Sequence, residues 1–240
     1  MIIEAGTKYY AELNQEIKSC EEREIIIKNV LGQRYIGTGV KDKVLTVYGT
    51  PGNAMGAYLN KSSIIVYGNV QDAVGDTMDN GDIIVHGHCG DTLGYGMRGG
   101  NIYIKGNAGY RTGIHMKAYL EHQPTIVIGG LAGAFLGEYQ AGGTIVVLGM
   151  EADQCFPTGN YCGTGMYGGT MYIRSGGVPK GLAPQVSAAL CTDKDIETIM
   201  PVLKNFCKYF DEDSDKIMEK PFYKLTPSAQ NPYNNLYTAY

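Results

Sequence analysis

The hydrophobic and polar positions along this chain follow a repeat. A phrase of the form apolar-any-apolar-any-glycine ends at Gly49, Gly68, Gly87, Gly106, Gly130 and Gly149. These glycines are 19, 19, 19, 24 and 19 residues apart, and related phrases end 20 residues earlier at Asn29 and 26 residues later at Ser175. Alternating β-branched residues over five positions predict a short strand. The sequence therefore predicts eight copies of a 19-residue unit, with insertions in the two longest steps.

Two positions of the phrase carry no polar residue in any copy. The first column holds Ile25, Leu45, Ile64, Ile83, Ile102, Ile126, Ile145 and Met171, and the second holds Ile27, Val47, Val66, Val85, Ile104, Ile128, Val147 and Ile173. The unit is too short for two helices, which take about 33 residues, and it allows about three short strands and three turns. We expect a solenoid whose coils pair as parallel strands around these two inward columns.

The residue between the two inward columns is expected to point away from the core. This outward column holds Ile26, Thr46, Ile65, Ile84, Tyr103, Val127, Val146 and Tyr172. Seven of the eight are apolar or aromatic, which is not the pattern of a solvated face. We expect this face to be covered, either by a terminal helix or by another protein.

The two flanks of the repeat predict helices. Residues 7–19 and 193–210 each place apolar side chains on one helical stripe, and Pro201 is expected to kink or divide the second helix. That helix either binds a partner or packs on the chain's own strands, and the second interpretation is favoured. The organisation predicted is a single domain over residues 1–240, with a helical cap at 1–22, coils at 23–176, and a C-terminal helix and extended tail at 177–240.

Composition narrows the class of protein. Of the 34 glycines, 28 lie between positions 49 and 176, where most fall on corner or turn positions of the unit. The net charge is −4 and no basic cluster indicates nucleic-acid binding. No apolar run reaches the roughly 18 residues of a membrane helix, and the N-terminus lacks the pattern of a signal peptide. We therefore expect a cytoplasmic protein whose six cysteines are thiols.

Two glycine motifs suggest a nucleotide site but have a plainer explanation. Residues 94–99 and 163–168 match the glycine spacing of a dinucleotide-binding loop. That loop lies between a strand and a helix, whereas both motifs here lie within the repeat and contain its own glycine and methionine positions. We interpret both as turns of the repeat.

The histidines and cysteines give equally weak signals. His86 and Cys89 resemble the start of a metal site, but in neighbouring units the same positions hold Tyr, Lys, Val or Ala. Cys155 and Cys162 flank the larger insertion without a nearby base or positive charge to activate a thiolate. The sequence predicts no catalytic, cofactor-binding or metal-ligating residue.

Several segments resemble one known family, the GXGXG domain at the C-terminus of the glutamate synthase large subunit. Residues 29–37 resemble its entry coil, residues 130–139 and 159–169 resemble its last coils, and residues 222–227 and 232–237 resemble the tail of its stand-alone versions. The resemblance covers nearly the whole chain. It implies an all-β fold, a right-handed parallel β-helix of about 19-residue coils with short N- and C-terminal helices.

The resemblance also implies a function. In this family a glutaminase domain releases ammonia, and a domain with FMN and iron–sulfur clusters forms glutamate from 2-oxoglutarate. The chain is therefore expected to be a non-catalytic scaffold subunit of a split glutamate synthase, without a cofactor of its own, that docks a glutaminase subunit and an FMN/iron–sulfur synthase subunit. Two alternatives stay open: the C subunit of a molybdenum or tungsten formylmethanofuran dehydrogenase, which shares the coils, and an independent carbohydrate-active enzyme.

Partner docking is expected at the two insertions and on the outward column, because excursions from a regular solenoid are places where partner contacts are easily built. The insertions are Lys117–Gln123 and Cys155–Tyr161. The residues expected to dock partners are Lys117, Tyr119, His122, Cys155, Phe156 and Tyr161 in the insertions, and Ile65, Ile84 and Tyr103 on the outward column. Whether the isolated chain self-associates stays open.

Overall fold

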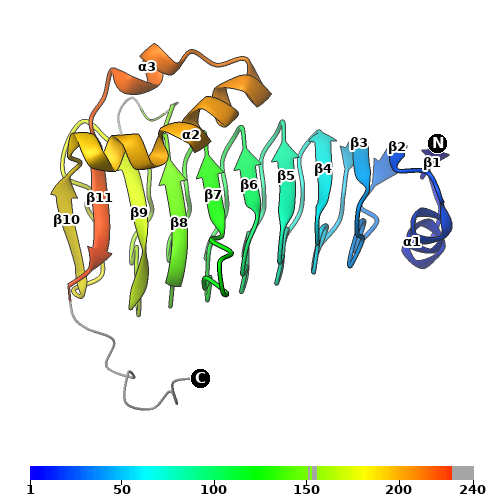
Figure 1. The fold of residues 1–240 in the computed structure, drawn as a ribbon, viewed down its shortest axis with the longest axis horizontal. Helices are drawn as coiled ribbons and strands as arrows, with labels where there is room; N and C mark the ends of the chain where they lie inside the picture. The colour runs from blue at the N-terminus through cyan, green and yellow to red at the C-terminus, as the bar shows by residue number, and fades with distance from the viewer. Residues whose placement is uncertain (151, 153–155, 229–240) are drawn as a thin grey trace.

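The structure is a computed structural model that describes residues 1–150, 152 and 156–228. Over these residues the chain forms eleven strands and three helices (Figure 1). In chain order they are β1 (Ile2–Glu4), α1 (Tyr10–Ser19), β2 (Glu24–Leu31), β3 (Val44–Thr50), β4 (Ser62–Tyr67), β5 (Gly81–Val85), β6 (Asn101–Ile104), β7 (Thr125–Ile128), β8 (Ala141–Val147), β9 (Gly168–Arg174), β10 (Val186–Leu190), α2 (Asp193–Phe210), α3 (Ser214–Met218) and β11 (Phe222–Pro227).

All eleven strands belong to one sheet. Its order is β1-β2-β3-β4-β5-β6-β7-β8-β9-β11-β10, so the strands from β1 to β9 pair in sequence order. These neighbours are parallel, whereas β11 pairs antiparallel with β9 and β10 pairs antiparallel with β11. The register follows the 19-residue step, as in the pairing of Ile64 with Ile83 and of Ile83 with Ile102.

The expected right-handed parallel β-helix is wrong. The structure is a single, mostly parallel mixed sheet that is not closed, and each unit supplies one strand rather than three. The reason lies in the turns: Ala54, Gly56 and Tyr58 have φ angles of 60°, 68° and 55°, and later units repeat this alternation. A backbone in the left-handed region does not form an extended strand. The turns therefore add isolated bridges, such as Val70 with Cys89, and no further sheet.

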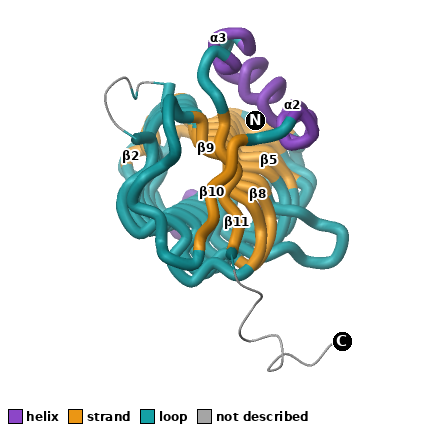
Figure 2. The backbone as a smooth tube through the Cα atoms, turned by 90° about the vertical axis from the view of Figure 1, so that its left-hand side faces the viewer, coloured by secondary structure: helices purple, strands orange, loops and turns teal. Residues whose placement is uncertain are grey.

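The turns nevertheless stack in step with the strands. The amide of Gly75 donates to the carbonyl of Met55 over 2.9 Å, and the amide of Gly94 donates to the carbonyl of Val74 over 2.8 Å. Figure 2 shows the strands one behind another with the turns returning beside them. Backbone amides and carbonyls, in the strands and in the turns alike, therefore form hydrogen bonds with the neighbouring unit. Buried backbone polar groups require such partners.

The core lies between the sheet and the layer of turns. The two inward columns predicted from the sequence are buried, with Ile25 at 1% exposure and the other fifteen side chains at 0%. The turns contribute a third column that includes Met78, Met97 and Met116, all fully buried. This methionine column fills the core as unbranched, adaptable side chains do.

The flanking helices close the core and cover one face of the sheet. Helix α1 buries Leu13 and Ile17 against the same core cluster as β1 and β2. Helix α2 runs unbroken through the exposed Pro201, so of the two expected effects, a kink or a division, the division does not occur. Buried side chains on both sides of the proline, Ile199 and Leu203, hold the two turns on the sheet and offset the hydrogen bond that proline cannot donate. In the described residues, no helix combines the length and the apolar character needed to cross a membrane.

Candidate functional site: the outer face of the sheet

The surface of the sheet that points away from the core, here called the outer face, carries two columns of side chains. The outward column predicted from the sequence is extended by Ile2, which pairs with Ile26. A second column follows it two residues further along each unit and holds Lys28, Tyr48, Tyr67, His86, Lys105, Gly129, Leu148 and Arg174. Which of these side chains can bind another molecule depends on what covers the two columns.

Helix α2 covers the outer face over the C-terminal strands. Its buried side chains are Ile199, Leu203, Phe206 and Phe210, and they form one cluster with Ile84, Tyr103, Val127, Val146, Leu148 and Tyr172. Figure 1 shows α2 and α3 above these strands and no helix above β2 and β3. We call the outer face of β5–β9 the covered half and that of β1–β4 the bare half. The prediction that the helix at 193–210 packs on the chain's own strands is confirmed.

Two features seat α2 on the covered half. Gly129 has no side chain, and a Cβ placed there would lie 2.7 Å from Cζ of Phe206, so only glycine lets this ring reach the sheet. Asn205 donates a hydrogen bond over 3.4 Å to the hydroxyl of Tyr103, whose pKa burial raises to about 12. The hydroxyl of Tyr103 is therefore neutral at pH 7.

Polar contacts fix both ends of this cover. At the start of α2, Thr192 and Asp195 form a capping box, and Nζ of Lys224 on β11 donates to Asp195 over 2.7 Å. The hydrogen bond from Lys224, followed by those from Thr192, lowers the pKa of Asp195 to about 2. Near α3, the buried guanidinium of Arg174 donates to the carbonyls of Ile217, Lys216 and Leu148 over 2.6, 2.9 and 3.2 Å. These bonds satisfy a cation that would otherwise be costly to bury.

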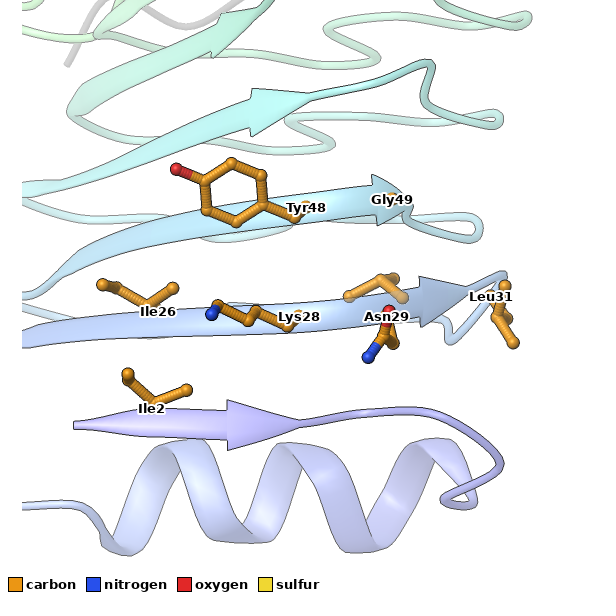
Figure 3. Close-up of a pocket in the computed structure, with 8 residues that line it drawn as sticks. Ile2, Ile26, Lys28, Asn29, Leu31, Tyr48 and Gly49 are labelled. Carbon is orange, nitrogen blue, oxygen red and sulfur yellow. The ribbon is translucent and has the colours of Figure 1, made fainter.

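The bare half exposes the continuation of the same columns. Ile2 is 58% exposed, Tyr48 is 43% exposed and Tyr67 is 47% exposed. A groove of about 680 Å³ lies here. Figure 3 shows side chains that line it, among them Ile2, Ile26, Lys28, Leu31 and Tyr48. Apolar side chains gathered in this way are typical of a surface that binds another protein.

An aromatic stack joins the two halves. The rings of Tyr48 and Tyr67 stack with centroids 5.1 Å apart, and Tyr67 stacks on His86 at 4.5 Å. The edge of Phe210, at the end of α2, meets the ring of His86 at 5.1 Å. Burial, and after it the charge of Lys105, lowers the pKa of His86, so its ring is neutral at pH 7. The surface therefore continues from under α2 into the bare half.

The residues expected to dock partners lie in different surroundings. On the outward column, Ile84 and Tyr103 are 4% and 0% exposed beneath α2, so neither reaches a partner in this arrangement, and Ile65 is partly buried at the edge of the cover. In the first insertion Tyr119 is 53% exposed, and it exchanges backbone hydrogen bonds with His122 that form a tight turn. Lys117 and His122 are exposed as well.

The second insertion is described in part. Cys155 lies outside the described residues. Phe156 is half-buried, and Nζ of Lys180 lies 5.3 Å from its ring centroid. Tyr161 is 60% exposed and stacks on Phe135 at 5.0 Å. The two insertions therefore present tyrosines at the turns, away from the groove on the outer face.

The other candidate motifs lie in structural positions. Residues 94–99 and 163–168 fall in turns that are followed by strands. Burial raises the pKa of Cys162 to about 12 and that of Cys89 still further, which keeps both thiols protonated at neutral pH. In the part of the chain that the structure describes, no three His, Cys, Asp or Glu side chains are grouped to hold a metal ion.

The bare half is the feature that sequence reasoning missed. The apolar character of the outward column predicts a cover but does not show how far the cover extends. A usable signal was the length of the helix: 18 residues span about 27 Å, whereas the eight spacings from β1 to β9 take about 38 Å. Even laid straight along the column, one helix of this length leaves about 11 Å, or about two strand spacings, uncovered.

Together, a repeated sheet, a capped core and an exposed apolar groove define a β-sheet repeat protein. Comparison with known proteins gives the family. The chain belongs to the GXGXG motif family, which matches residues 3–228 and is the family of the glutamate synthase domain that the sequence resembles. The chain is also similar to an uncharacterized protein of Methanocaldococcus jannaschii, with 43% identity over 254 aligned positions that cover 99% of this chain and 96% of that protein.

Proposed function

We propose that this chain is the non-catalytic structural subunit of a split glutamate synthase. In this proposal it holds a glutaminase subunit, which releases ammonia, against a synthase subunit that carries FMN and iron–sulfur clusters and forms glutamate from 2-oxoglutarate. The observation that carries the proposal is the extent of the family match, which runs from residue 3 to residue 228. The chemistry of glutamate synthase belongs to other domains, so a chain made of this domain contributes structure.

The surface of the chain supports a docking role. Tyr119 and Tyr161 stand at the two insertions, and Tyr48 and Tyr67 stand on the bare half, all of them more than 40% exposed. Tyrosine supplies a large contact area at a low cost in side-chain entropy and is enriched in protein interfaces. The turns and the bare half offer separate surfaces, which suits a subunit that binds two partners.

Purification of the assembled complex tests the proposal. The chain is tagged at its chromosomal locus in its native host and isolated at low salt, and the recovered polypeptides are identified by mass spectrometry. We expect a glutaminase polypeptide, a polypeptide with flavin absorbance and stoichiometric iron, and formation of glutamate from glutamine and 2-oxoglutarate. The separate chain is expected to show neither flavin nor activity.

Three results would contradict the proposal. One is recovery of the chain without any flavin or iron–sulfur polypeptide. Another is recovery with a molybdenum- or tungsten-containing polypeptide, which would favour a formylmethanofuran dehydrogenase. The third is hydrolysis of a polysaccharide by the separate chain, lost on changing one acidic residue, which would favour an independent enzyme.

A further inference from the structure

The bare half continues the surface on which α2 already packs. Ile65, on β4, is partly buried against the cluster under α2, and Ile26 and Ile2 continue the same column beyond it. Along this column Tyr103 and Ile84 are 0% and 4% exposed, Ile65, Thr46 and Ile26 are half-buried, and Ile2 is 58% exposed. A surface that binds one amphipathic helix thus extends past the end of that helix, and on this column Thr46 is its one polar residue.

The dimensions of the bare half fit a second, shorter helix. The four spacings from β5 to β1 measure about 19 Å, a length that about 12 helical residues span. A helix satisfies its own backbone hydrogen bonds, whereas an extended peptide laid across the face of a sheet leaves its amides without partners. The face of β1–β4 therefore favours a helix of about three turns over an added strand.

Charge on the second column indicates which way this helix runs. At the end of α2, Nζ of Lys105 lies 3.4 Å from the carbonyl oxygen of Phe210 and 3.5 Å from the carboxylate of Glu212. Lys28 occupies the same column four strands further along. It is exposed, and its neighbour on β1 is Glu4, whose carboxylate accepts a hydrogen bond from Asn29 over 2.6 Å. Among the described residues, the ammonium group of Lys28 itself has no hydrogen-bonding or ionic partner. A cation at a helix C-terminus interacts favourably with the helix dipole.

We propose that the bare half binds an amphipathic helix of about three turns from a partner subunit, in line with α2 and with its C-terminal end over Lys28. Its apolar face fills the groove between Ile2, Ile26 and Tyr48, in the way that Leu203, Phe206 and Phe210 fill the covered half. A carboxylate after its last turn pairs with Lys28 as Glu212 pairs with Lys105. This inference rests on the proposed function, because that function supplies the partner.

Site-specific crosslinking in the native complex tests the occupant. A photoreactive benzoylphenylalanine replaces Ile26 in the groove or, as a control, Val178, which is exposed on a loop away from it. We expect position 26 to capture a peptide of the glutaminase or synthase subunit with apolar residues at a spacing of three and four, and position 178 not to capture it. Capture of a second copy of this chain, or of a peptide without that spacing, would overturn the inference.

Three surface variants separate the inference from the proposed function. Ile2→Asp and Val178→Asp change side chains of equal exposure, 58%, so neither disturbs the core. We expect Ile2→Asp to reduce recovery of the helix-bearing subunit at least tenfold, Lys28→Glu to reduce it a few-fold, and Val178→Asp to leave it unchanged. Equal recovery with all three variants would overturn the inference while the proposed function stands. Loss of every partner from the wild-type chain would overturn both.

Discussion

The two halves of the outer face share one core and differ in what lies on top of it. Behind both halves the inward columns are at most 1% exposed. On the outer side, the outward column is apolar at every position but Thr46, yet Tyr103 is fully buried and Ile2 is 58% exposed. The residues of that column therefore do not decide which half carries α2.

The second column makes the difference. In the covered half it begins with His86 and Lys105, at the end of α2, and continues with Gly129, Leu148 and Arg174 beneath the helices. The glycine lets Phe206 approach the sheet, and the arginine binds carbonyls of α3 and Leu148. In the bare half it holds Lys28, Tyr48 and Tyr67; the two tyrosine rings stack on each other, and Lys28 and Tyr48 line the groove. Small or buried residues on this column suit a cover from within the chain, and large aromatic ones suit a partner.

The largest expected effect comes from loosening the cover. Phe206→Ala removes a fully buried ring that packs on Gly129 and lies 4.8 Å from the ring of Phe210. We expect the free energy of unfolding, measured by urea titration followed by circular dichroism, to fall by about 3–5 kcal/mol, as for other buried aromatic residues. Tyr67→Ala on the bare half is expected to cost less than about 1 kcal/mol, as is usual at the surface. Equal losses would mean that the two halves do not differ as described.

The next prediction tests whether the core is the same behind both halves. Gly56, behind the bare half, and Gly113, behind the covered half, have φ angles of 68° and 72°. A Cβ at these positions would lie 2.6 Å from Ile83 and 2.5 Å from Ile145. Each Gly→Ala change is expected to cost about 2–4 kcal/mol, from left-handed strain and overpacking together.

The two losses are expected to agree within about 1 kcal/mol, the scale on which context shifts such values. Gly39 serves as the control, because its φ of 64° is similar and no atom lies within 4 Å of a Cβ built on it. Gly39→Ala is expected to cost about 1 kcal/mol from backbone strain alone. A much smaller loss at Gly56 than at Gly113 would show that α2 stabilises the core beneath it and not only the outer face.

A smaller effect is expected from acid, and only on the covered half. The folded-state pKa of Asp195 is about 2, below its ordinary value of 3.8, so its ionised form stabilises the fold. This contribution is complete above about pH 4 and is lost as the pH falls toward 2. Asp195→Asn keeps an oxygen that can accept from the amide of Thr192 but removes the negative charge that pairs with Lys224, and we expect it to cost about 1 kcal/mol at pH 6.

Urea midpoints of wild type and Asp195→Asn, measured from pH 6 to pH 2, check this prediction. Because other carboxylates titrate over the same range, the informative quantity is the difference between the two proteins. We expect the difference to shrink as the pH falls below 4. A difference that stays constant would show that the charge of Asp195 does not hold α2 in place.

Much of the fold could be predicted from the sequence, because the inward columns and the strand register follow directly from the 19-residue period. The number of strands per unit could not. The number of strands depends on left-handed backbone at residues such as Ala54 and Tyr58, which are not glycines. Such residues disfavour this conformation, and the stacking of the turns imposes it on them. For the candidate site, an apolar column predicts that its side chains are covered but not which element covers them. The sequence pattern therefore does not distinguish Ile84 and Tyr103, which lie buried under α2, from the exposed Ile2.

The smallest expected effect is also the one that separates a binding surface from a structural one. In the isolated chain, Ile2→Asp is expected to change the free energy of unfolding by no more than about 0.5 kcal/mol, as is usual for exposed side chains. Val178→Asp, at the same 58% exposure, is expected to behave identically. A loss of several kcal/mol at Ile2 alone, in urea titrations of the two variants side by side, would mean that β1 needs this side chain for folding. The exposed column would then be explained by stability, and the bare half would resemble the covered half after all.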